Sequence, residues 1–500
     1  MSNLSLWKTV FFTCVIYAMQ AITSPAQTFT TLLSFNGTDG AEPVAVLVQG
    51  TDGNFYGTTA AGGTNSNANF CNNPGFLCGT VFKITPTGTM TTLYNFCAQT
   101  GCTDGADPGA GLVQATDGNF YGTTPEGGAN GPCNGYGCGT IFKITAGGAL
   151  TTLHSFDGTD GSYPNGLVLA TNGDFYGTTN QGGANNAGTI FKMTADGTLT
   201  TLYNFCSQTN CTDGSTSFAA LIQATDRNLY GTTWAGGASG LGTVFKITPS
   251  GTLTTLHSFD GSDGSYPYAG LVQATDGNFY GTTARGGTVF KMTPGGTLTT
   301  LATVGALLYA GLVQASDGNL YGTNYLGGAN GAGFVFKITL KGVVTTLYNF
   351  CSQTGCTDGA DPLAGLMQAT NGNFYGTTVY GGDGSLTCAQ GIPGCGAAFN
   401  LSVGLGPFVE TRPTSGKVGA AVIILGNNLK GSTSVTFNGT PATFKVVSST
   451  EIKTTVPSGA TTGRVNVVTP SRTLTSNVNF RVTPATSSSS PRTGPAAQSR

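Results

Sequence analysis

The sequence predicts an all-β protein in which a seven-bladed β-propeller precedes a smaller β-sandwich. One motif recurs seven times, centred on Tyr56, Tyr121, Tyr176, Tyr230, Tyr280, Tyr321 and Tyr375. Each of the first six copies holds four runs typical of short strands, and the last copy holds three. The strand-like run that the last copy lacks stands ahead of the first copy, which predicts a closed ring.

Each copy is expected to form one blade of four antiparallel strands. In the fullest copy, the run Leu112 to Ala115 leads through Asp117-Gly118 into Asn119 to Thr123. An Asp-Gly pair between alternating runs is a strong hairpin signal. The third run is Thr140 to Thr145, and the fourth ends at Phe156. No copy has apolar residues at the helical period, which excludes helical repeats.

The two ends of the repeat region, residues 28–404, are expected to complete one blade together. Thr30 to Phe35 has the pattern of an outer strand, and the last copy stops after its third run, Ala398 to Ser402. If the first run pairs with the last, no sheet edge stays open. The alternative is a pair of stacked sandwiches, which gives no reason for the split.

Ring closure predicts two different faces. The turns between strands one and two, and between strands three and four, are short and uniform, and we call their side the plain face. The other connections hold the cysteine pairs and most of the variation in length. We call their side the cysteine face.

Export is predicted from the first residues and from the cysteines. Residues 1–26 resemble a signal peptide, with Lys8 before the apolar stretch Val10 to Ile22, and we expect cleavage after Ala26. An uncleaved anchor is the alternative. Twelve later cysteines form six close pairs, which predicts disulfides and a secreted or cell-surface protein. The pairs are Cys71 and Cys78, Cys97 and Cys102, Cys133 and Cys138, Cys206 and Cys211, Cys351 and Cys356, Cys388 and Cys395. Zinc would need two pairs to converge, because the chain has only two histidines to add.

Low charge limits the classes of partner. Asp, Glu, Lys and Arg make up 8% of the chain and the net charge is −2, so no basic surface for nucleic acid is expected. No segment after the signal peptide is long and apolar enough to predict a membrane span.

Residues 407–483 read as a short-stranded sandwich without cysteine or histidine. Strands are expected at Ala421 to Leu425, Ser434 to Phe437, Ala442 to Val447, Glu451 to Val456, Arg464 to Val468 and Val478 to Val482. The motifs RPTSG, VIILGNNL, VTFNGTPA and VPSG resemble the IPT/TIG family of immunoglobulin-like domains. That resemblance implies a spacer or an interaction domain. The tail 485–500 is rich in Ser, Pro and Thr and is predicted to be disordered.

The repeat motifs DGNFYGTT, the Gly-Gly loop and VFKIT resemble the bacterial Gloeobacter/Verrucomicrobia-type tandem repeat, also called GloVer. The sequence departs from the pattern at Asn324, in place of Thr, and at Asn400, in place of Lys. The resemblance implies a surface or secreted location. It implies no reaction and supplies no catalytic residue.

A candidate ligand site lies at the two positions before each Gly-Gly, where the repeat fixes the surroundings but not the residue. Ring closure would display these positions around the cysteine face. The residues able to stack or to hydrogen-bond there are Asn180, Gln181, Trp234, Arg285, Tyr325 and Tyr380. They are candidates for binding a sugar or a peptide. The alternative is that they are unconstrained loop residues.

One acid followed by Gly recurs in the loops after the outer strands: Asp39, Asp104, Asp160, Asp213, Asp263 and Asp358. Such loops suit either calcium or an Asx-type turn, and the spacing does not match an EF-hand. The turn is favoured, and no cofactor is expected. His154 and His257 stand where other copies have tyrosine, which predicts a packing role.

We therefore expect an exported, non-catalytic binding protein whose cysteine face recognises a carbohydrate or an extracellular protein. One alternative is a polysaccharide lyase or glycoside hydrolase, for which Glu126, Asp157 and Asp260 are the candidate acids. The other is a structural component of the cell envelope.

Overall fold

The computed structural model describes residues 27–65, 78–131, 133, 135–383, 387–389 and 392–484. The predicted signal peptide, the tail 485–500 and Cys71 lie outside the described residues. The described chain is all-β, with three 3-10 turns, η1 (Thr100–Cys102), η2 (Thr209–Cys211) and η3 (Thr354–Cys356). No helix in these residues is long and apolar enough to cross a membrane.

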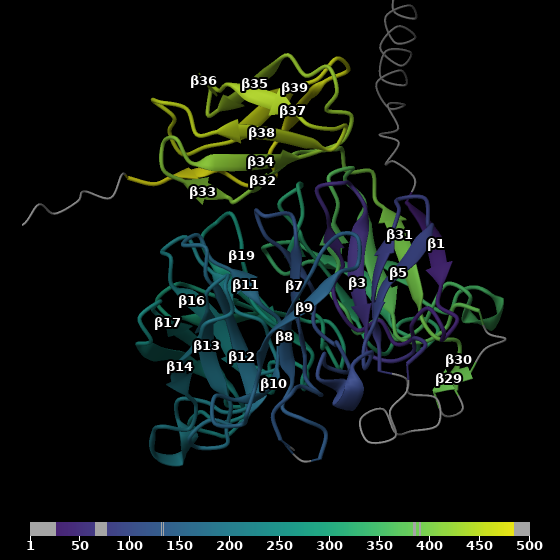
Figure 1. The fold of residues 1–500 in the computed structure, drawn as a ribbon, viewed down its shortest axis with the longest axis vertical. Helices are drawn as coiled ribbons and strands as arrows, with labels where there is room; N and C mark the ends of the chain where they lie inside the picture. The colour runs from purple at the N-terminus through teal and green to yellow at the C-terminus, as the bar shows by residue number, and fades with distance from the viewer. Residues whose placement is uncertain are drawn as a thin grey trace, which may run out of the picture.

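The repeat region consists of small antiparallel sheets (Figure 1). The first two hold β2 (Val48–Gln49), β3 (Phe55–Thr59), β4 (Thr80–Ile84) and β5 (Met90–Asn95), and β6 (Val113–Gln114), β7 (Phe120–Thr124), β8 (Thr140–Ile144) and β9 (Leu150–Ser155). The third adds a strand: β10 (Ser162–Pro164), β11 (Val168–Leu169), β12 (Phe175–Gln181), β13 (Thr189–Met193) and β14 (Leu199–Asn204).

The same pattern continues along the chain. The next sheets hold β15 (Ile222–Gln223), β16 (Leu229–Thr233), β17 (Thr243–Ile247) and β18 (Leu253–Ser258); β19 (Val272–Gln273), β20 (Phe279–Thr282), β21 (Thr288–Met292) and β22 (Leu298–Thr303); and β23 (Val313–Gln314), β24 (Leu320–Asn324), β25 (Phe334–Ile338) and β26 (Val344–Asn349). The last holds β27 (Met367–Gln368), β28 (Phe374–Thr378), β31 (Ala397–Ser402) and β1 (Thr28–Ser34). A small hairpin, β29 (Thr387–Ala389) and β30 (Ile392–Pro393), lies beside it.

The pairing of the two ends is confirmed. Strand β1 lies antiparallel to β31, with Thr28 opposite Ser402 and Ser34 opposite Ala397. The ring of Phe29 stacks on Tyr348 of the preceding sheet at 3.8 Å between centroids. The first strand therefore supplies the outer edge of the last sheet.

Neighbouring sheets are joined by one repeated hydrogen bond. In each sheet a threonine hydroxyl of the second strand donates to a backbone carbonyl ahead of the next inner strand, as Thr58 donates to Ala110 at 3.0 Å. The last sheet makes this bond to the first, because the Thr377 hydroxyl donates to the carbonyl of Pro43 at 2.8 Å.

The DGNFYGTT motif is explained by its own contacts. The Asp117 carboxylate accepts hydrogen bonds from the backbone and side chain of Asn119 and from the Tyr121 hydroxyl, the last at 3.0 Å. Gly122 lies against Phe142 and Leu112, where a Cβ would overlap both side chains. Asp, Asn, Tyr and Gly are thus each required by the hairpin and by sheet packing.

The C-terminal domain is a sandwich with its own core, which includes Val422, Ile424, Val435, Phe437 and Ile452. One sheet orders β32 (Glu410–Arg412), β34 (Ala421–Leu425), β38 (Glu451–Thr455) and β37 (Phe444–Val446). The other orders β36 (Thr440–Pro441), β35 (Ser434–Phe437), β39 (Val465–Val468) and β40 (Thr473–Thr475), and β33 (Ser415–Gly416) pairs with β41 (Arg481–Val482) in parallel.

This domain lies on the plain face, at the top of Figure 1, whereas β29 and β30 lie on the opposite side. The Thr450 hydroxyl donates to the Thr51 carbonyl at 2.8 Å, and Asn427 donates to the Thr370 hydroxyl at 2.7 Å. Arg412 reaches Gln114 at 3.1 Å. The C-terminal domain therefore covers part of the plain face and leaves the cysteine face open.

Five of the six predicted cysteine pairs are disulfides in the structure: Cys97–Cys102, Cys133–Cys138, Cys206–Cys211, Cys351–Cys356 and Cys388–Cys395. The sixth pair includes Cys71. Among the described residues, Cys78 lies with Cys97 and Cys102 within 4.8 Å, but the last two are bonded to each other. Zinc therefore finds no support in these pairs.

Candidate ligand-binding site

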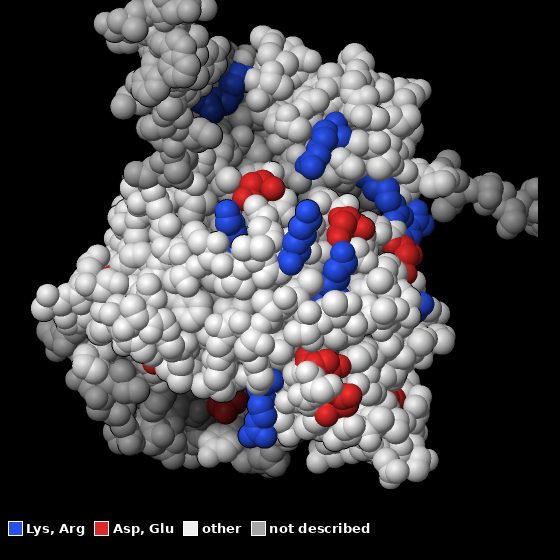
Figure 2. Space-filling view, turned by 180° about the vertical axis from the view of Figure 1, so that it is seen from behind, with Lys and Arg blue, Asp and Glu red and all other residues white. Residues whose placement is uncertain are grey.

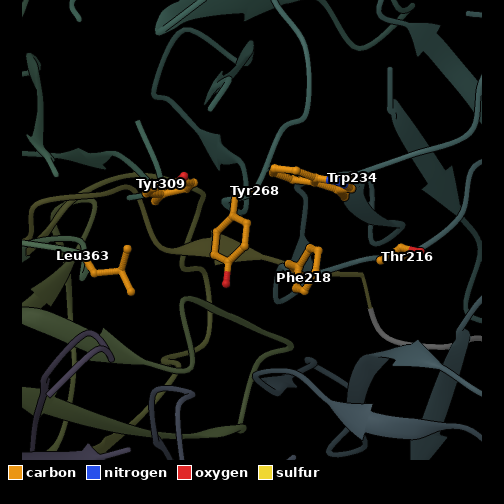
Figure 3. A pocket seen from close by; sticks show the side chains of 6 residues that line it. All are labelled: Thr216, Phe218, Trp234, Tyr268, Tyr309 and Leu363. Carbon is orange, nitrogen blue, oxygen red and sulfur yellow. The ribbon is translucent and has the colours of Figure 1, made fainter. Parts of the chain in front are cut away.

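A pocket of about 620 Å³ opens on the cysteine face. Its walls come from the loops before the inner strands β15, β19, β23 and β27 of four consecutive sheets, and from the loop that follows β16. The lining residues are Thr216, Phe218, Trp234, Tyr268, Tyr309 and Leu363 (Figure 3). Aromatic side chains from different sheets therefore share one cavity.

Tyr268 stands at the centre of this aromatic wall, between Tyr309 and Trp234 (Figure 3). Its ring stacks on Phe218 with 4.8 Å between centroids. It meets Tyr309 edge-on at 5.3 Å and Trp234 edge-on at 5.9 Å. Mutual packing of these rings fixes their orientation before any ligand arrives.

Ring contacts place three of the six predicted site residues in this region. Trp234 lines the pocket, and Tyr325 packs against Tyr309 at 5.7 Å. The Arg285 guanidinium lies over the ring of Tyr266 at 5.4 Å, and that ring is 4.8 Å from Trp234. The other three predicted residues are Asn180, Gln181 and Tyr380.

Tyr380 is linked to this region through the charges of nearby acids, whereas Asn180 and Gln181 do not line the pocket. Burial raises the pKa of Tyr380, and the charges of Glu42 and Asp361 raise it further. Gln181 instead pairs with Ser162 at the edge between β12 and β10.

A non-glycine residue with positive φ recurs before the inner strand of each sheet, two positions after a loop glycine, and one of these residues, Thr216, lines the pocket. These residues are Glu42, Asp107, Tyr163, Thr216, Tyr266, Leu307 and Asp361, with φ from 54° to 65°. We call them the mouth residues. Positive φ is uncommon outside glycine and costs free energy, so the surroundings must impose it.

Backbone hydrogen bonds impose this conformation. The Thr216 N–H donates to the Ala187 carbonyl of the preceding sheet at 2.9 Å, and the Thr216 carbonyl accepts from the Trp234 N–H at 2.8 Å. Glu42 donates to the carbonyl of Cys395 in the last sheet at 3.1 Å. Each mouth residue is thus held between two sheets, with its side chain free to vary.

Four carboxyl groups gather on one side of the mouth. Glu42, Asp107 and Asp361 are mouth residues, and Glu126 is bridged to the neighbouring Ala106 through the backbone. Burial raises the pKa of Glu126 to about 7 and that of Asp361 to about 6. Burial also raises the pKa of Asp107 well above its usual value, and the charges of Glu126 and Glu42 add to the increase.

Only one of the three acids predicted for an enzyme lies here. Glu126 is part of the acidic side, but Asp157 and Asp260 sit in exposed turns. The Asp157 carboxylate accepts from the backbone and hydroxyl of Thr159 at 2.8 and 2.7 Å, and Asp260 accepts likewise from Ser262. Of the three candidate acids of the enzyme alternative, Asp157 and Asp260 each close their own loop instead.

The recurring loop aspartates have contacts of the same structural kind. Asp104 accepts from the Tyr94 hydroxyl at 2.8 Å and from the N–H groups of Ala98 and Gln99. His154 contacts Asp160 at 2.6 Å in the place of such a tyrosine. These bonds anchor each loop to the outer strand, as expected of turn formers rather than of calcium ligands.

Sequence reasoning missed most of the site. Glu42, Asp107 and Asp361 share the setting Gly-Ala-acid-Pro. That recurrence could have identified them, although a residue before proline normally favours extended negative φ. The pocket residues Phe218, Tyr268 and Tyr309 each stand two positions after the mouth residue of their own copy. The residue type at this position differs between copies. Only the equivalence of position, not a motif, connects them.

The family described as the Gloeobacter/Verrucomicrobia repeat matches residues 13–223, 134–308 and 208–389, and the IPT/TIG domain matches residues 409–482. No curated protein matches the chain significantly in sequence.

Solved structures resemble the repeat architecture at low identity. A streptogramin B lyase is 15% identical with a TM-score of 0.49, and the match covers 75% of this chain and 97% of that one. A virginiamycin B lyase from Staphylococcus aureus, solved with quinupristin, is 16% identical with a TM-score of 0.49, covering 75% and 99%. A PQQ-bound aldose sugar dehydrogenase from Streptomyces coelicolor is 14% identical with a TM-score of 0.36, covering 75% and 99%.

Proposed function

Since this chain belongs to the Gloeobacter/Verrucomicrobia repeat family and ends in an IPT/TIG domain, we propose that it is an exported, non-catalytic binding protein. Its repeat region forms a seven-bladed propeller, and the pocket on the cysteine face takes a carbohydrate. The disulfides support an oxidising, extracellular location.

Two observations support the closed seven-bladed ring. Strand β1 completes the last sheet, and the Thr377 bond to Pro43 repeats between the last and first sheets the contact made between consecutive ones. A second series agrees with it: the Gln49 side chain accepts from the Thr370 N–H at 3.0 Å, as Gln114 accepts from Thr51.

The aromatic pocket is the observation that carries the binding proposal. Its rings are contributed by three sheets and are oriented by one another, while acidic groups lie close by. Aromatic rings pack against the apolar face of a pyranose, and nearby polar groups bind its hydroxyls. An extracellular protein would instead need a wider flat surface around the mouth.

Loss of the aromatic wall tests the proposal. We expect Trp234→Ala and Tyr309→Ala to reduce binding in a glycan array by about tenfold or more, since aromatic anchors dominate such contacts. Tyr136→Ala is the matched control, because Tyr136 is an exposed tyrosine, 45% accessible, outside the pocket wall. Equal binding by wild type and both pocket variants would refute the site.

A lyase or glycoside hydrolase is the second candidate, favoured by the raised carboxyl pKa values. A group whose pKa is about 7, such as Glu126, can act as a general acid at neutral pH. Chromatography of cell-wall polysaccharides after incubation would detect products. Products that vanish with Glu126→Gln, while binding persists, would favour the enzyme over the binding protein.

A further inference from the structure

The mouth has two chemically different sides. The acidic side comes from three consecutive sheets. Asp361 belongs to the sheet of β27, Glu42 to the sheet of β2, and Asp107 and Glu126 to the sheet of β6. The aromatic side comes from the sheets of β15, β19 and β23. The ring order places these sheets in two consecutive groups, and Leu363, which lines the pocket, stands two positions after Asp361. A ligand that extends from the pocket over the mouth would therefore pass from the rings to the carboxyl groups.

The two sides are close enough to influence each other electrostatically. The pKa of Tyr268 is raised by burial, by Tyr309 and by the charge of Asp107. Burial raises the pKa of Tyr325 to about 12, with further contributions led by Asp361. Tyr268 lines the pocket, so Asp107 on the acidic side influences a residue of the pocket wall.

The acidic side has no counter-ion from the described part of the chain. The ion pairs of the described residues lie elsewhere, for example Lys192–Asp174 and Lys291–Asp276 at hairpin turns. None of them includes the acids of the mouth, Glu42, Asp107, Glu126 and Asp361. The Arg285 guanidinium is stacked on Tyr266, whose ring lies beside Trp234. On the side of the molecule seen in Figure 2, the charges form small mixed groups on a mostly uncharged surface. Crowded carboxyl groups without a partner favour an incoming cation.

We infer that the pocket binds a sugar bearing a free, positively charged amino group, with its ring on the aromatic side and its ammonium on the acidic side. This inference rests on the proposed function and specifies the ligand. An ammonium group makes charge-assisted hydrogen bonds to carboxylates, and it is also attracted to aromatic faces. A pocket of about 620 Å³ accommodates one or two sugar units rather than an extended chain.

Trp234 provides a direct optical readout. The chain has two tryptophans, Trp7 and Trp234, so the full chain with Trp7→Phe carries its only tryptophan in the pocket. Fluorescence titration at pH 7 would compare glucosamine oligomers, their N-acetylated forms and uncharged glucose oligomers of equal length. Trilysine is a fourth arm that represents a basic peptide.

The expected result is that glucosamine oligomers bind about tenfold or more tightly than the N-acetylated and uncharged forms. The double variant Asp361→Asn with Glu126→Gln is expected to abolish this preference while still binding uncharged oligomers. Asn keeps the shape of Asp and tolerates positive φ, so the mouth should retain its backbone. Asp196→Asn, at an exposed hairpin turn, is the matched control and should keep the preference.

The outcomes separate the two proposals. Equal or tighter binding of the N-acetylated form would overturn the amine inference but leave carbohydrate binding intact. Tighter binding of trilysine would assign the pocket to a basic peptide and overturn the inference. If no oligosaccharide changes the fluorescence or binds by calorimetry, the proposed function fails and the inference fails with it.

Discussion

Asn324 is the residue where the repeat pattern breaks inside the core. The other copies place threonine here. Where the third strand also begins with threonine the two hydroxyls pair, as those of Thr233 and Thr243 do at 2.8 Å, whereas Phe334 stands opposite Asn324. Asn324 is 1% exposed, and neither its amide nitrogen nor its amide oxygen has a hydrogen-bond partner in the described structure. A buried polar group without a partner destabilises the fold.

We therefore predict that Asn324→Thr stabilises the protein by about 1 kcal/mol, because it replaces two unsatisfied atoms by one hydroxyl of similar bulk. Urea unfolding followed by fluorescence measures the change. The reverse substitution in another copy, Thr233→Asn, should destabilise. A lower unfolding midpoint for Asn324→Thr would show that the amide has a partner that the described contacts lack.

Asp276 illustrates how single residues set the response to acid. Burial raises its pKa, but hydrogen bonds from Asn278, Lys291 and Tyr280 outweigh burial and lower the pKa to about 2. Its folded pKa is below the unfolded value of about 3.9. The stabilisation is therefore present above pH 4 and is lost as the pH falls towards 2.

We predict that Asp276→Asn lowers the free energy of unfolding at pH 7 and that the difference from wild type disappears near pH 2. Urea titrations at several pH values would measure it. The third copy supports tolerance of the substitution, because Asn172 contacts Tyr176 there at 3.1 Å. A difference that is constant from pH 7 to pH 2 would contradict the assigned pKa.

At the scale of the element, the loops that carry the cysteine pairs are held by two kinds of contact, a disulfide and an aspartate. In the fourth copy, the Cys206–Cys211 disulfide closes the loop, and Asp213 binds its backbone and the Tyr203 hydroxyl at 2.7 Å. The sixth copy lacks both the cysteines and the acid, yet its sheet forms. The loop anchors therefore serve the loop and its face more than the sheet.

Replacing Cys206 and Cys211 together by serine is predicted to cost about 2 kcal/mol, the chain-entropy value for so short a loop. Differential scanning calorimetry would measure the loss. The pocket contacts of Trp234 should survive, because Asp213 still anchors the loop. Loss of ligand binding with an unchanged melting temperature would reverse this assignment.

Strand patterns were readable from the sequence because each copy repeats the same hairpin chemistry. Val113–Gln114, Phe120–Thr124 and Thr140–Ile144 lie within a residue of expectation. The pocket was only partly predictable. Trp234 was identified by its variable position, but Tyr268 and Tyr309 meet it only through ring geometry, which no local spacing encodes.

At the scale of the whole molecule, β1 is predicted to be indispensable. Deletion of residues 28–35 would leave β31 as an unpaired edge and remove the stacking of Phe29 on Tyr348. Exposed edges pair with other chains. Size-exclusion chromatography should show oligomers or aggregates. Deletion of residues 485–500 is the control and should leave a monodisperse protein, whereas a monodisperse product from both deletions would contradict the role of β1.

The docking of the C-terminal domain could not be foreseen, since its contacts with Thr51, Gln114 and Thr370 use residues that the repeat needs for its turns. The equivalent residues of the other copies follow the same repeat pattern, so the sequence does not indicate which of them contact the C-terminal domain.

The pairing of Thr28 with Ser402 also sets the timing of folding. Strand β1 leaves the ribosome before its partner β31, which follows some hundreds of residues later. Contacts at such sequence separation form slowly. The chain must therefore keep β1 unpaired during synthesis, and its last sheet is completed only when residues 397–402 arrive.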